Sequence, residues 1–246
     1  MSLPVHVVPT LDGVGVGTEV TVEGDEAHHA VAVRRLRVGE HVVITDGAGT
    51  AARGSVASTG KRVFTVVAEE VTRHERPAPE VVVVQALPKG DRGELAVEVL
   101  TEIGAARIVP WAASRSVAVW KGERAAKSLA RWRATAREAA KQARRAWFPE
   151  VHELASTAEV ATLVAAADLA VVLHEEATAP LAALDVPVTG RVVVVVGPEG
   201  GLSEDEVATF VTAGAVSVRL GAEVLRTSTA GLAAVAALLS RTARWG

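Results

Sequence analysis

Hydrophobic and polar positions follow one pattern in the first 72 residues of the chain. Short β-branched runs alternate there with clusters of turn residues, such as 46–49 and 58–60. The runs predict strands over 19–22, 40–45 and 62–67. Short strands repeated at this spacing are typical of a small β-barrel, so we assign residues 1–72 to an N-terminal β-barrel domain.

The pattern changes after residues 73–80, a polar segment with two prolines that we interpret as an interdomain linker. From residue 81 to residue 246, uninterrupted apolar runs alternate with stretches of helical periodicity. The apolar runs predict strands over 81–87, 107–111, 169–173, 191–196 and 217–220. This alternation indicates an α/β domain with a parallel sheet covered by helices on both faces. Because chain connections rarely thread through loops, the pattern alone predicts an unknotted doubly wound sheet.

Three stretches show helical periodicity strongly. Residues 91–104 place the apolar Leu95, Val99 and Ile103 at four-residue spacing, which predicts a helix over this stretch. An Ala- and Leu-rich stretch predicts a last helix over 230–241. Between these two helices, apolar residues recur at three- or four-residue steps on one face of a third helix: Leu129, Trp132, Ala136, Ala139, Ala143 and Trp147.

Composition excludes several classes of function. The chain has no cysteine, which excludes disulfide scaffolds, thiolate metal sites and cysteine nucleophiles. No run reaches the roughly 18 consecutive apolar residues of a membrane helix. The first six residues lack the basic and apolar regions of a signal peptide, so we expect a cytoplasmic protein.

Basic residues are concentrated in two places, although the net charge is −3. Residues 121–147 contain nine Lys or Arg and only two Glu. Four of these cations step along a second face of the third helix: Arg133, Arg137, Lys141 and Arg144. Charged stripes are usually solvated helix faces, but the nearly unmixed sign favours contact with nucleic-acid phosphates. The N-terminal domain carries the second group: His28, His29, Arg34, Arg35 and Arg37. No third histidine or carboxylate lies at metal-binding spacing from the histidine pair, so we expect no metal.

The most informative motif is a glycine loop between the strand at 191–196 and a helix. The loop is Gly197-Pro198-Glu199-Gly200-Gly201-Leu202-Ser203, and Ser203 with Glu206 predicts a capping box at the helix start. Glycines let backbone N–H groups approach a ligand at the carboxyl end of a parallel strand, where α/β proteins bind small molecules. An ordinary strand-to-helix turn is the alternative, because the loop matches neither the Walker nor the dinucleotide glycine spacing.

A second motif of the same kind follows the strand at 217–220. It runs from Gly221 to Thr229, contains Arg226, and offers Thr227 or Ser228 as the N-cap of the last helix. Two neighbouring strand ends with glycine turns make a shared ligand site more plausible than either alone. An isolated arginine in such a loop is also compatible with a helix cap or an ion pair.

The two motifs together resemble the RsmE family of SPOUT methyltransferases, which methylate N3 of a uridine in 16S ribosomal RNA. The resemblance covers essentially the whole chain in order. Its further matches are His28-His29-x-x-x-Val33-x-Arg35, Thr101-Glu102-Ile103-Gly104-Ala105, Gln142, Arg145 and Pro149. The chain departs from the family's usual residues at Glu98, Val99, Lys141, Glu223 and Ser228.

The resemblance implies a PUA-like N-terminal domain, a second domain with a trefoil knot, a homodimer, and S-adenosylmethionine bound in the knot loops. Carried onto this sequence, the residues for the cofactor are Leu173, Gly197, Pro198, Glu199, Gly200, Gly201, Leu220, Gly221, Leu225, Arg226 and Thr229. Those expected to contact 16S RNA are His28, His29, Arg34, Arg35, Arg37, Arg133, Arg137, Lys141, Arg144 and Arg145. The residue with a candidate catalytic role is Arg226, and Glu199 is a second candidate whose alternative role is to shape the loop.

The sequence therefore predicts a methyltransferase that moves a methyl group from S-adenosylmethionine to a uracil ring nitrogen of small-subunit RNA. Two alternatives stay open at this point. One is a non-catalytic RNA-binding or ribosome-assembly factor in which the glycine loops are structural, and the other is a knotted enzyme that methylates the ribose 2′-oxygen.

Overall fold

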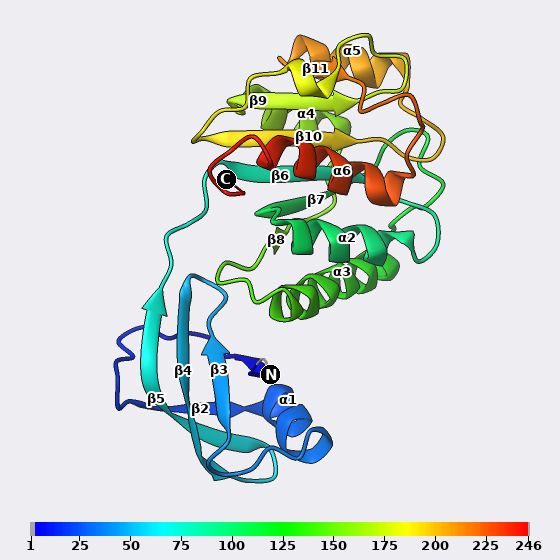
Figure 1. Ribbon diagram of the computed structural model, residues 1–246. Helices are drawn as coiled ribbons and strands as arrows, with labels where there is room; N and C mark the ends of the chain where they lie inside the picture. The colour runs from blue at the N-terminus through cyan, green and yellow to red at the C-terminus, as the bar shows by residue number, and fades with distance from the viewer. Residues whose placement is uncertain (1–2, 246) are drawn as a thin grey trace. The chain divides into compact units, whose positions relative to one another are not determined.

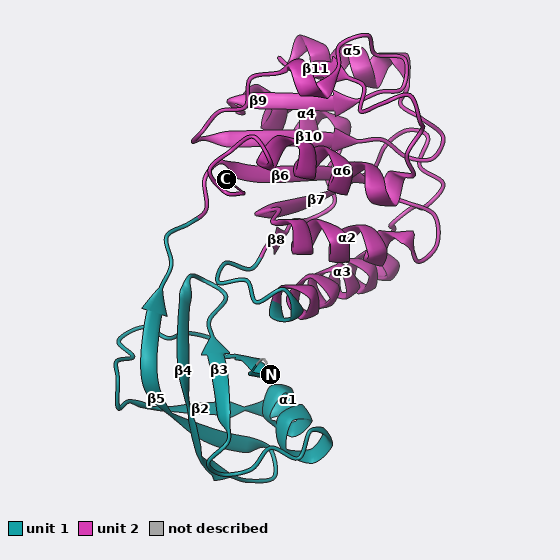
Figure 2. Cartoon of the chain, in the orientation of Figure 1, with its two compact units in different colours: residues 1–76, 141–148 teal, residues 77–140, 149–246 magenta. Residues whose placement is uncertain are grey.

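The computed structural model describes residues 3–245 and divides the chain into two compact units (Figure 2). Met1, Ser2 and Gly246 lie outside the described residues. The first unit contains residues 1–76 and also 141–148, and the second contains 77–140 and 149–246. No pattern in the sequence indicated that 141–148 belongs with the first unit. The domain limits 1–72 and 81–246, with the linker 73–80, remain a prediction.

The first unit is built on a five-stranded sheet with the strand order β1-β3-β4-β5-β2 (Figure 1). Its strands are β1 Val5–Val7, β2 Glu19–Glu23, β3 His41–Thr45, β4 Thr50–Thr59 and β5 Val63–Arg73. Neighbours are antiparallel except β1 and β3, which are parallel. Every predicted strand is present. β4 was not predicted, because its small and polar residues carry little strand signal and its pairing with β5 is broken by two register shifts.

Two short helical segments connect β2 to β3. They are α1 Gly24–His28 and the π-helix η1 His29–Val33, so the histidine pair lies at their junction. Ala27 and Ala30 are fully buried, whereas both histidines are exposed. The pair therefore faces solvent on the first unit.

The second unit is built on a six-stranded sheet, entirely parallel, with the order β11-β9-β10-β6-β7-β8. Its strands are β6 Glu80–Ala86, β7 Arg107–Trp111, β8 Glu150–Val151, β9 Leu169–Leu173, β10 Arg191–Val196 and β11 Val216–Val218. Its helical segments are α2 Arg92–Ile103, α3 Glu123–Gln142, α4 Thr157–Ala165, η2 Leu181–Ala183, α5 Glu204–Thr212 and α6 Thr227–Leu239. The α/β fold with a parallel sheet is confirmed.

Both faces of this sheet are covered, as predicted. Val81 and Val83 of β6 pack into a core with residues of α2, α3 and α6, whereas Val82 and Val84 pack into a second core with residues of α4 and α5. Alternate valines of one strand thus belong to opposite cores because successive side chains of a strand point to opposite faces. A strand that is buried on both faces therefore appears in the sequence as a continuous apolar run, as in β6.

The helix predicted over 91–104 is present as α2. Its most deeply buried residues are not the three that show the four-residue spacing. Leu95 is 43% exposed and Val99 is half-buried, whereas Val97, Leu100 and Thr101 are buried. The helix is turned so that this second stripe packs on α6. Gly231 of α6 permits the close approach, because a Cβ atom at Gly231 would lie 3.0 Å from Leu100.

The third predicted helix is shorter than expected. Leu129, Trp132, Ala136 and Ala139 are buried as predicted, but α3 ends at Gln142. The exposed Ala143 and the half-buried Trp147 lie beyond its end. Arg144 has a φ of 53°, in the left-handed region that continues no helix.

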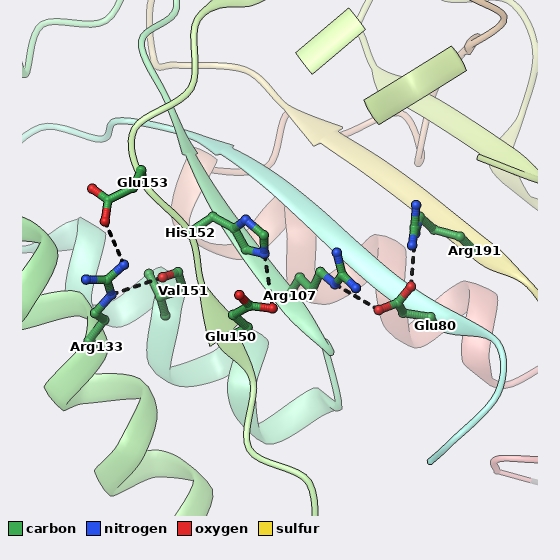
Figure 3. Close-up of polar contacts among 8 residues, drawn as sticks. All are labelled: Glu80, Arg107, Arg133, Glu150, Val151, His152, Glu153 and Arg191. Carbon is green, nitrogen blue, oxygen red and sulfur yellow. Dashed lines mark hydrogen bonds and ion pairs between the residues drawn. The ribbon is translucent and has the colours of Figure 1, made fainter. Parts of the chain in front are cut away.

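Ion pairs join the amino-terminal ends of the central strands. Glu80 is the first residue of β6, and its carboxylate forms two ion pairs (Figure 3). Oε1 lies 2.9 Å from Nε of Arg107 in β7, and Oε2 lies 2.9 Å from Nε of Arg191 in β10. Burial raises the pKa of Glu80, but the hydrogen bond from Arg191 and the charge of Arg107 outweigh it and lower the pKa. These contacts lie at the opposite edge of the sheet from the loops described below.

The last crossing returns the chain from the edge of the sheet to its middle. β11 is the edge strand, and the chain that follows it comes back so that α6 packs on β10 and β6. The trefoil knot itself remains a prediction from the family resemblance. Among the helices described between residues 3 and 245, none is long and apolar enough to span a bilayer.

Candidate functional site

Four loops meet at the carboxyl-terminal edge of the parallel sheet. They follow β6, β9, β10 and β11 and contain residues 87–91, 174–180, 197–203 and 219–226. Since these strands are parallel, their carboxyl ends share one edge, which is the position at which open α/β sheets bind ligands.

The glycine loop ends in the predicted capping box. Ser203 Oγ accepts the N–H of Glu206 at 3.2 Å, and Glu206 Oε2 accepts the N–H of Ser203 at 2.9 Å. Glu206 is only 4% exposed, and its other oxygen accepts the N–H of Ser114 at 2.7 Å. One carboxylate therefore caps α5 and also fixes the loop after β7.

Arg115 braces the glycine loop from this neighbouring loop. Its guanidinium donates to the carbonyl oxygens of Leu202 at 3.1 Å and Gly200 at 3.5 Å. A Cβ atom at Gly200 would lie 3.1 Å from the Arg115 carbonyl oxygen, and Gly201 has a φ of +73°. The loop thus needs glycine at one position for close approach and at the next for its backbone conformation.

Backbone hydrogen bonds tie the loop after β11 to the loop after β9. Arg219 N–H donates to the Ala179 carbonyl at 2.9 Å, and Leu181 N–H donates to the Arg219 carbonyl at 3.0 Å. His174 N–H donates to the Val218 carbonyl at 3.0 Å. The two loops consequently form one connected surface.

Side chains connect the glycine loop to its other neighbours. The Thr227 hydroxyl donates to the Gly197 carbonyl at 2.6 Å, and Glu199 accepts the Lys89 N–H at 3.1 Å. Glu199 also lies 4.0 Å from a guanidinium nitrogen of Arg92. The carboxylate of Glu199 is therefore engaged in holding the loop after β6, which favours its loop-shaping role over a catalytic one.

The structure brings the residues predicted to bind the cofactor to this single edge. Each lies at a strand end, in one of the four loops, or in the first turn of α6: Leu173, Gly197, Pro198, Glu199, Gly200, Gly201, Leu220, Gly221, Leu225, Arg226 and Thr229. Their contact with a ligand remains a prediction.

Arg226 is the N-cap residue of α6, so the expectation that Thr227 or Ser228 would cap this helix was wrong. Thr227 and Ser228 are both buried within the first turn of α6. The Thr227 hydroxyl donates its hydrogen bond to the Gly197 carbonyl and does not cap the helix. The Arg226 side chain is exposed and forms no hydrogen bond or ion pair with the residues described. Its backbone is fixed, because the Arg226 carbonyl accepts the N–H groups of Thr229 and Ala230, both at 2.9 Å.

The candidate RNA-binding residues divide into exposed and engaged groups. The exposed ones on the first unit are His28, His29, Arg34, Arg35, Arg37 and Arg144. Arg145 is half-buried and donates to the Trp147 carbonyl at 2.9 Å.

Arg133 and Lys141 of the predicted cationic stripe have intramolecular partners. Arg133 donates to the Val151 carbonyl at 3.1 Å and to Glu153 at 2.9 Å (Figure 3). The Lys141 side chain is only 15% exposed, and its ammonium donates to both oxygens of Glu26, at 2.9 and 3.1 Å. Contact of this stripe, which also includes Arg137, with RNA phosphates remains a prediction.

Glu26 is the centre of this second contact within the first unit. His6 Nδ1 lies 3.1 Å from one Glu26 oxygen, and the Glu26 side chain is 14% exposed. Burial raises the pKa of Glu26, but the hydrogen bonds from His6 and Lys141 outweigh it, so the pKa falls to about 2. The carboxylate is thus charged in the folded unit at every pH above that value.

We expect Glu26→Gln to destabilise the first unit by about 2–3 kcal/mol at pH 5 and to have little effect near pH 2. The folded pKa lies below the ordinary value of 4.5, so this stabilisation is complete above pH 4.5 and is lost as the pH falls toward 2. Urea unfolding of both proteins across this range measures the difference. Glu69→Gln is the control, because Glu69 pairs with His41 at 43% exposure and should cost less than about 0.5 kcal/mol. A constant difference between wild type and Glu26→Gln at pH 5 and pH 2 would contradict the assignment.

Sequence reasoning missed Gln85, Arg115 and the true contact of Thr227. Gln85 could have been noticed, because it is a lone polar residue within an apolar run and is fully buried. Arg115 carried no local signal, since its partners lie about 85 residues away in the sequence.

The fold and the four-loop edge are those of an RNA methyltransferase with a PUA unit. An RNA methyltransferase domain model matches residues 74–239, and an RNA methyltransferase PUA domain model matches residues 22–69. The chain belongs to the ribosomal RNA small subunit methyltransferase E family.

Individual relatives support this membership. The chain is 46% identical to ribosomal RNA small subunit methyltransferase E of Mycobacterium tuberculosis, over 93% of this chain and 89% of that protein. It is 32% identical to the Bacillus subtilis protein of the same name, over 90% of each. The enzyme of that name from Neisseria gonorrhoeae, solved bound to S-adenosyl methionine, superposes with a TM-score of 0.85 at 27% identity, over 97% of this chain and 98% of that one.

Proposed function

We propose that this protein transfers a methyl group from S-adenosylmethionine to N3 of a uridine in 16S ribosomal RNA. The observation that carries the proposal is the connected set of loops at the carboxyl edge of the sheet, which lies in a chain of this family. The uracil N3 position follows from the resemblance of the two glycine motifs to that family. The S-adenosyl methionine in the Neisseria gonorrhoeae relative supports the choice of methyl donor.

The residues at the edge fit this donor. The glycine loop exposes backbone at Gly200 and Gly201, and Leu220 and Leu225 supply apolar surface that suits a purine ring. Hydrogen bonds between the loops at this edge hold them in one arrangement. The entropy cost of ordering the loops when the ligand binds is therefore small. When bound, S-adenosylmethionine supplies an activated methyl group on a sulfonium sulfur.

We assign to Arg226 the stabilisation of the uracil base as it reacts. N3 of uracil becomes a nucleophile when it loses its proton, and the resulting negative charge spreads onto the two ring oxygens. A planar, permanently charged guanidinium suits this anion, and Arg226 has no competing partner among the described residues. Its role is to stabilise the uracil anion at its carbonyl oxygens.

The first unit supplies an exposed basic surface for RNA. Arg34, Arg35 and Arg37 are exposed near the histidine pair and are not used in any described ion pair. Arg35 has a φ of 58°, so the segment is a tight turn that presents its side chains outward. Phosphate contact is the proposed role of this surface.

Replacing Arg34, Arg35 and Arg37 with Ala should weaken RNA binding and reduce the salt dependence of log Kd by about 2–3 units, if each cation contacts one phosphate. S-adenosylmethionine affinity should not change, because these residues lie in a different unit from the loops. Binding titrations against 16S RNA at several salt concentrations measure the slope. Arg62→Ala is the matched control in the same unit, because the Arg62 guanidinium is paired with Asp25, and it should leave the slope unchanged. Equal slopes for the triple variant and wild type would contradict the assignment.

We further propose that the protein acts as a homodimer in the cytoplasm. The homodimer follows from the family resemblance, and sedimentation of the purified protein tests it. Val224, at 74% exposure, and Leu225, at 41%, lie beside Arg226, so apolar surface is available for a partner at this edge.

Transfer of labelled methyl groups to isolated small subunits and to naked 16S RNA tests the proposed function. We expect incorporation into at least one substrate and micromolar affinity for S-adenosylmethionine by calorimetry. A non-catalytic assembly factor would bind the subunit without any affinity for the methyl donor.

A further inference from the structure

Gln85 and Thr227 form a buried hydrogen-bond relay that ends on the glycine loop. Gln85 Nε2 donates to Thr227 Oγ1 at 3.2 Å, and Thr227 Oγ1 donates to the Gly197 carbonyl at 2.6 Å. Gln85 is fully buried and Thr227 is 6% exposed. The relay therefore joins the end of β6, the first residue of α6 and the first residue of the loop after β10, three segments that are distant in sequence.

The direction of the relay follows from the atoms available. A threonine hydroxyl has one proton, and the contact with a carbonyl oxygen uses it, so the same hydroxyl can only accept from Gln85. Gln85 Nε2 also donates to the Ala86 carbonyl at 3.1 Å. Gln85 Oε1 is buried without a hydrogen-bond partner among the described residues. The hydrogen bonds of this side chain are therefore those that its amide nitrogen donates.

We infer that Gln85 and Thr227 are positioning residues for methyl transfer, and that they act by fixing Arg226 against the glycine loop. Arg226 immediately precedes Thr227, and nothing described holds its guanidinium. By holding the first turn of α6 to Gly197, the relay fixes the position of the Arg226 backbone and hence the point from which its side chain extends. This inference rests on the proposed function, because it gives these two side chains a part in that same reaction.

Thr227→Val removes the hydroxyl with little change in shape and leaves the Gly197 carbonyl and the Gln85 amide without their partner. We expect it to lower kcat about 10- to 100-fold, the range that follows from misplacing a catalytic group by about 1 Å. KM for the small subunit should change less than about threefold, because Thr227 is buried and the proposed RNA surface is made of residues of the other unit. Thr227→Ser keeps the hydroxyl and should retain kcat within about threefold of wild type. The kcat of Gln85→Met should lie between those of Thr227→Val and Thr227→Ser.

A double-mutant cycle separates positioning from a general structural role. If Thr227 acts through Arg226, adding Thr227→Val to Arg226→Ala should change kcat less than about threefold, whereas independent effects multiply. Multiplying effects, or equal rates for Thr227→Val and Thr227→Ser, would overturn the inference.

Hydrogen exchange keeps the inference testable even if the wild-type protein proves inactive on RNA, an outcome that refutes the proposed function alone. The Thr229 and Ala230 amides donate to the Arg226 carbonyl, so their exchange reports the start of α6 without turnover. Thr227→Val should accelerate this exchange about tenfold or more while the amides of β7 stay protected. Unchanged exchange at Thr229 and Ala230 would show that the relay fixes nothing.

Discussion

Arg226→Ala is expected to lower kcat for methyl transfer by about 10²–10³, the range found when a preorganised donor to a developing anion is removed. The side chain is exposed, has no described partner and belongs to the residue just before α6, so its loss should leave the fold intact. Dissociation constants for S-adenosylmethionine and for the small subunit should change much less than kcat. Single-turnover methylation measures the rate, and calorimetry measures the affinity of the methyl donor.

Two further measurements define the role of Arg226. Arg226→Lys should recover little activity, because an ammonium cannot match two carbonyl oxygens as a planar guanidinium does. Raising the pH should partly restore the Ala variant, since solvent then supplies the uracil anion. Arg219→Ala is the matched control, because Arg219 is an exposed arginine of the same loop that contributes only backbone hydrogen bonds. Loss of cofactor affinity in proportion to the rate would make Arg226 a binding residue instead.

Gly201→Val is expected to abolish detectable S-adenosylmethionine binding, a loss of at least about 100-fold. A β-branched residue strongly disfavours a φ of +73°, so the loop must leave the arrangement that Arg115 braces. A Cβ atom at this position would lie 3.9 Å from Arg115, so the effect comes from the backbone conformation and from obstruction of the ligand. Calorimetry with the purified variant measures the loss, and unfolding of the first unit should be unchanged.

Gly214→Val is the matched control for this substitution. Gly214 follows α5, has a φ of +108° and has open space around its Cβ position, so it carries comparable strain away from the four loops. It should lower the stability of the second unit and leave the affinity for S-adenosylmethionine unchanged. Equal affinity of Gly201→Val and wild type would remove the glycine loop from the binding site.

The second unit was predictable because its signals are local. Buried parallel strands such as 191–196 appear as continuous valine runs, and the Ser203–Glu206 capping box marks a helix start within four residues. The placement of the candidate site at the carboxyl ends of the strands followed from predicting that the strands are parallel. Its individual contacts with cofactor and RNA are still predictions.

The remaining features depend on partners that are far apart in sequence. Lys141 belongs to the cationic stripe by its spacing, but its ammonium donates a hydrogen bond to Glu26, 115 positions earlier in the sequence. Thr227 looked like a helix cap because its hydroxyl stands at a helix start, but a carbonyl 30 residues away accepts its proton. Such pairings arise only when the chain has folded, so neither periodicity nor spacing carries them.

The identity of the methylated atom tests the central claim most directly. After labelled methyl transfer to small subunits, the 16S RNA is digested to nucleosides and the labelled product is identified by chromatography and mass spectrometry against standards. The account predicts a single labelled product, N3-methyluridine, formed by the wild-type protein and reduced about 10²–10³ in rate by Arg226→Ala. A label on a ribose 2′-oxygen, or on any base other than uracil, would contradict it.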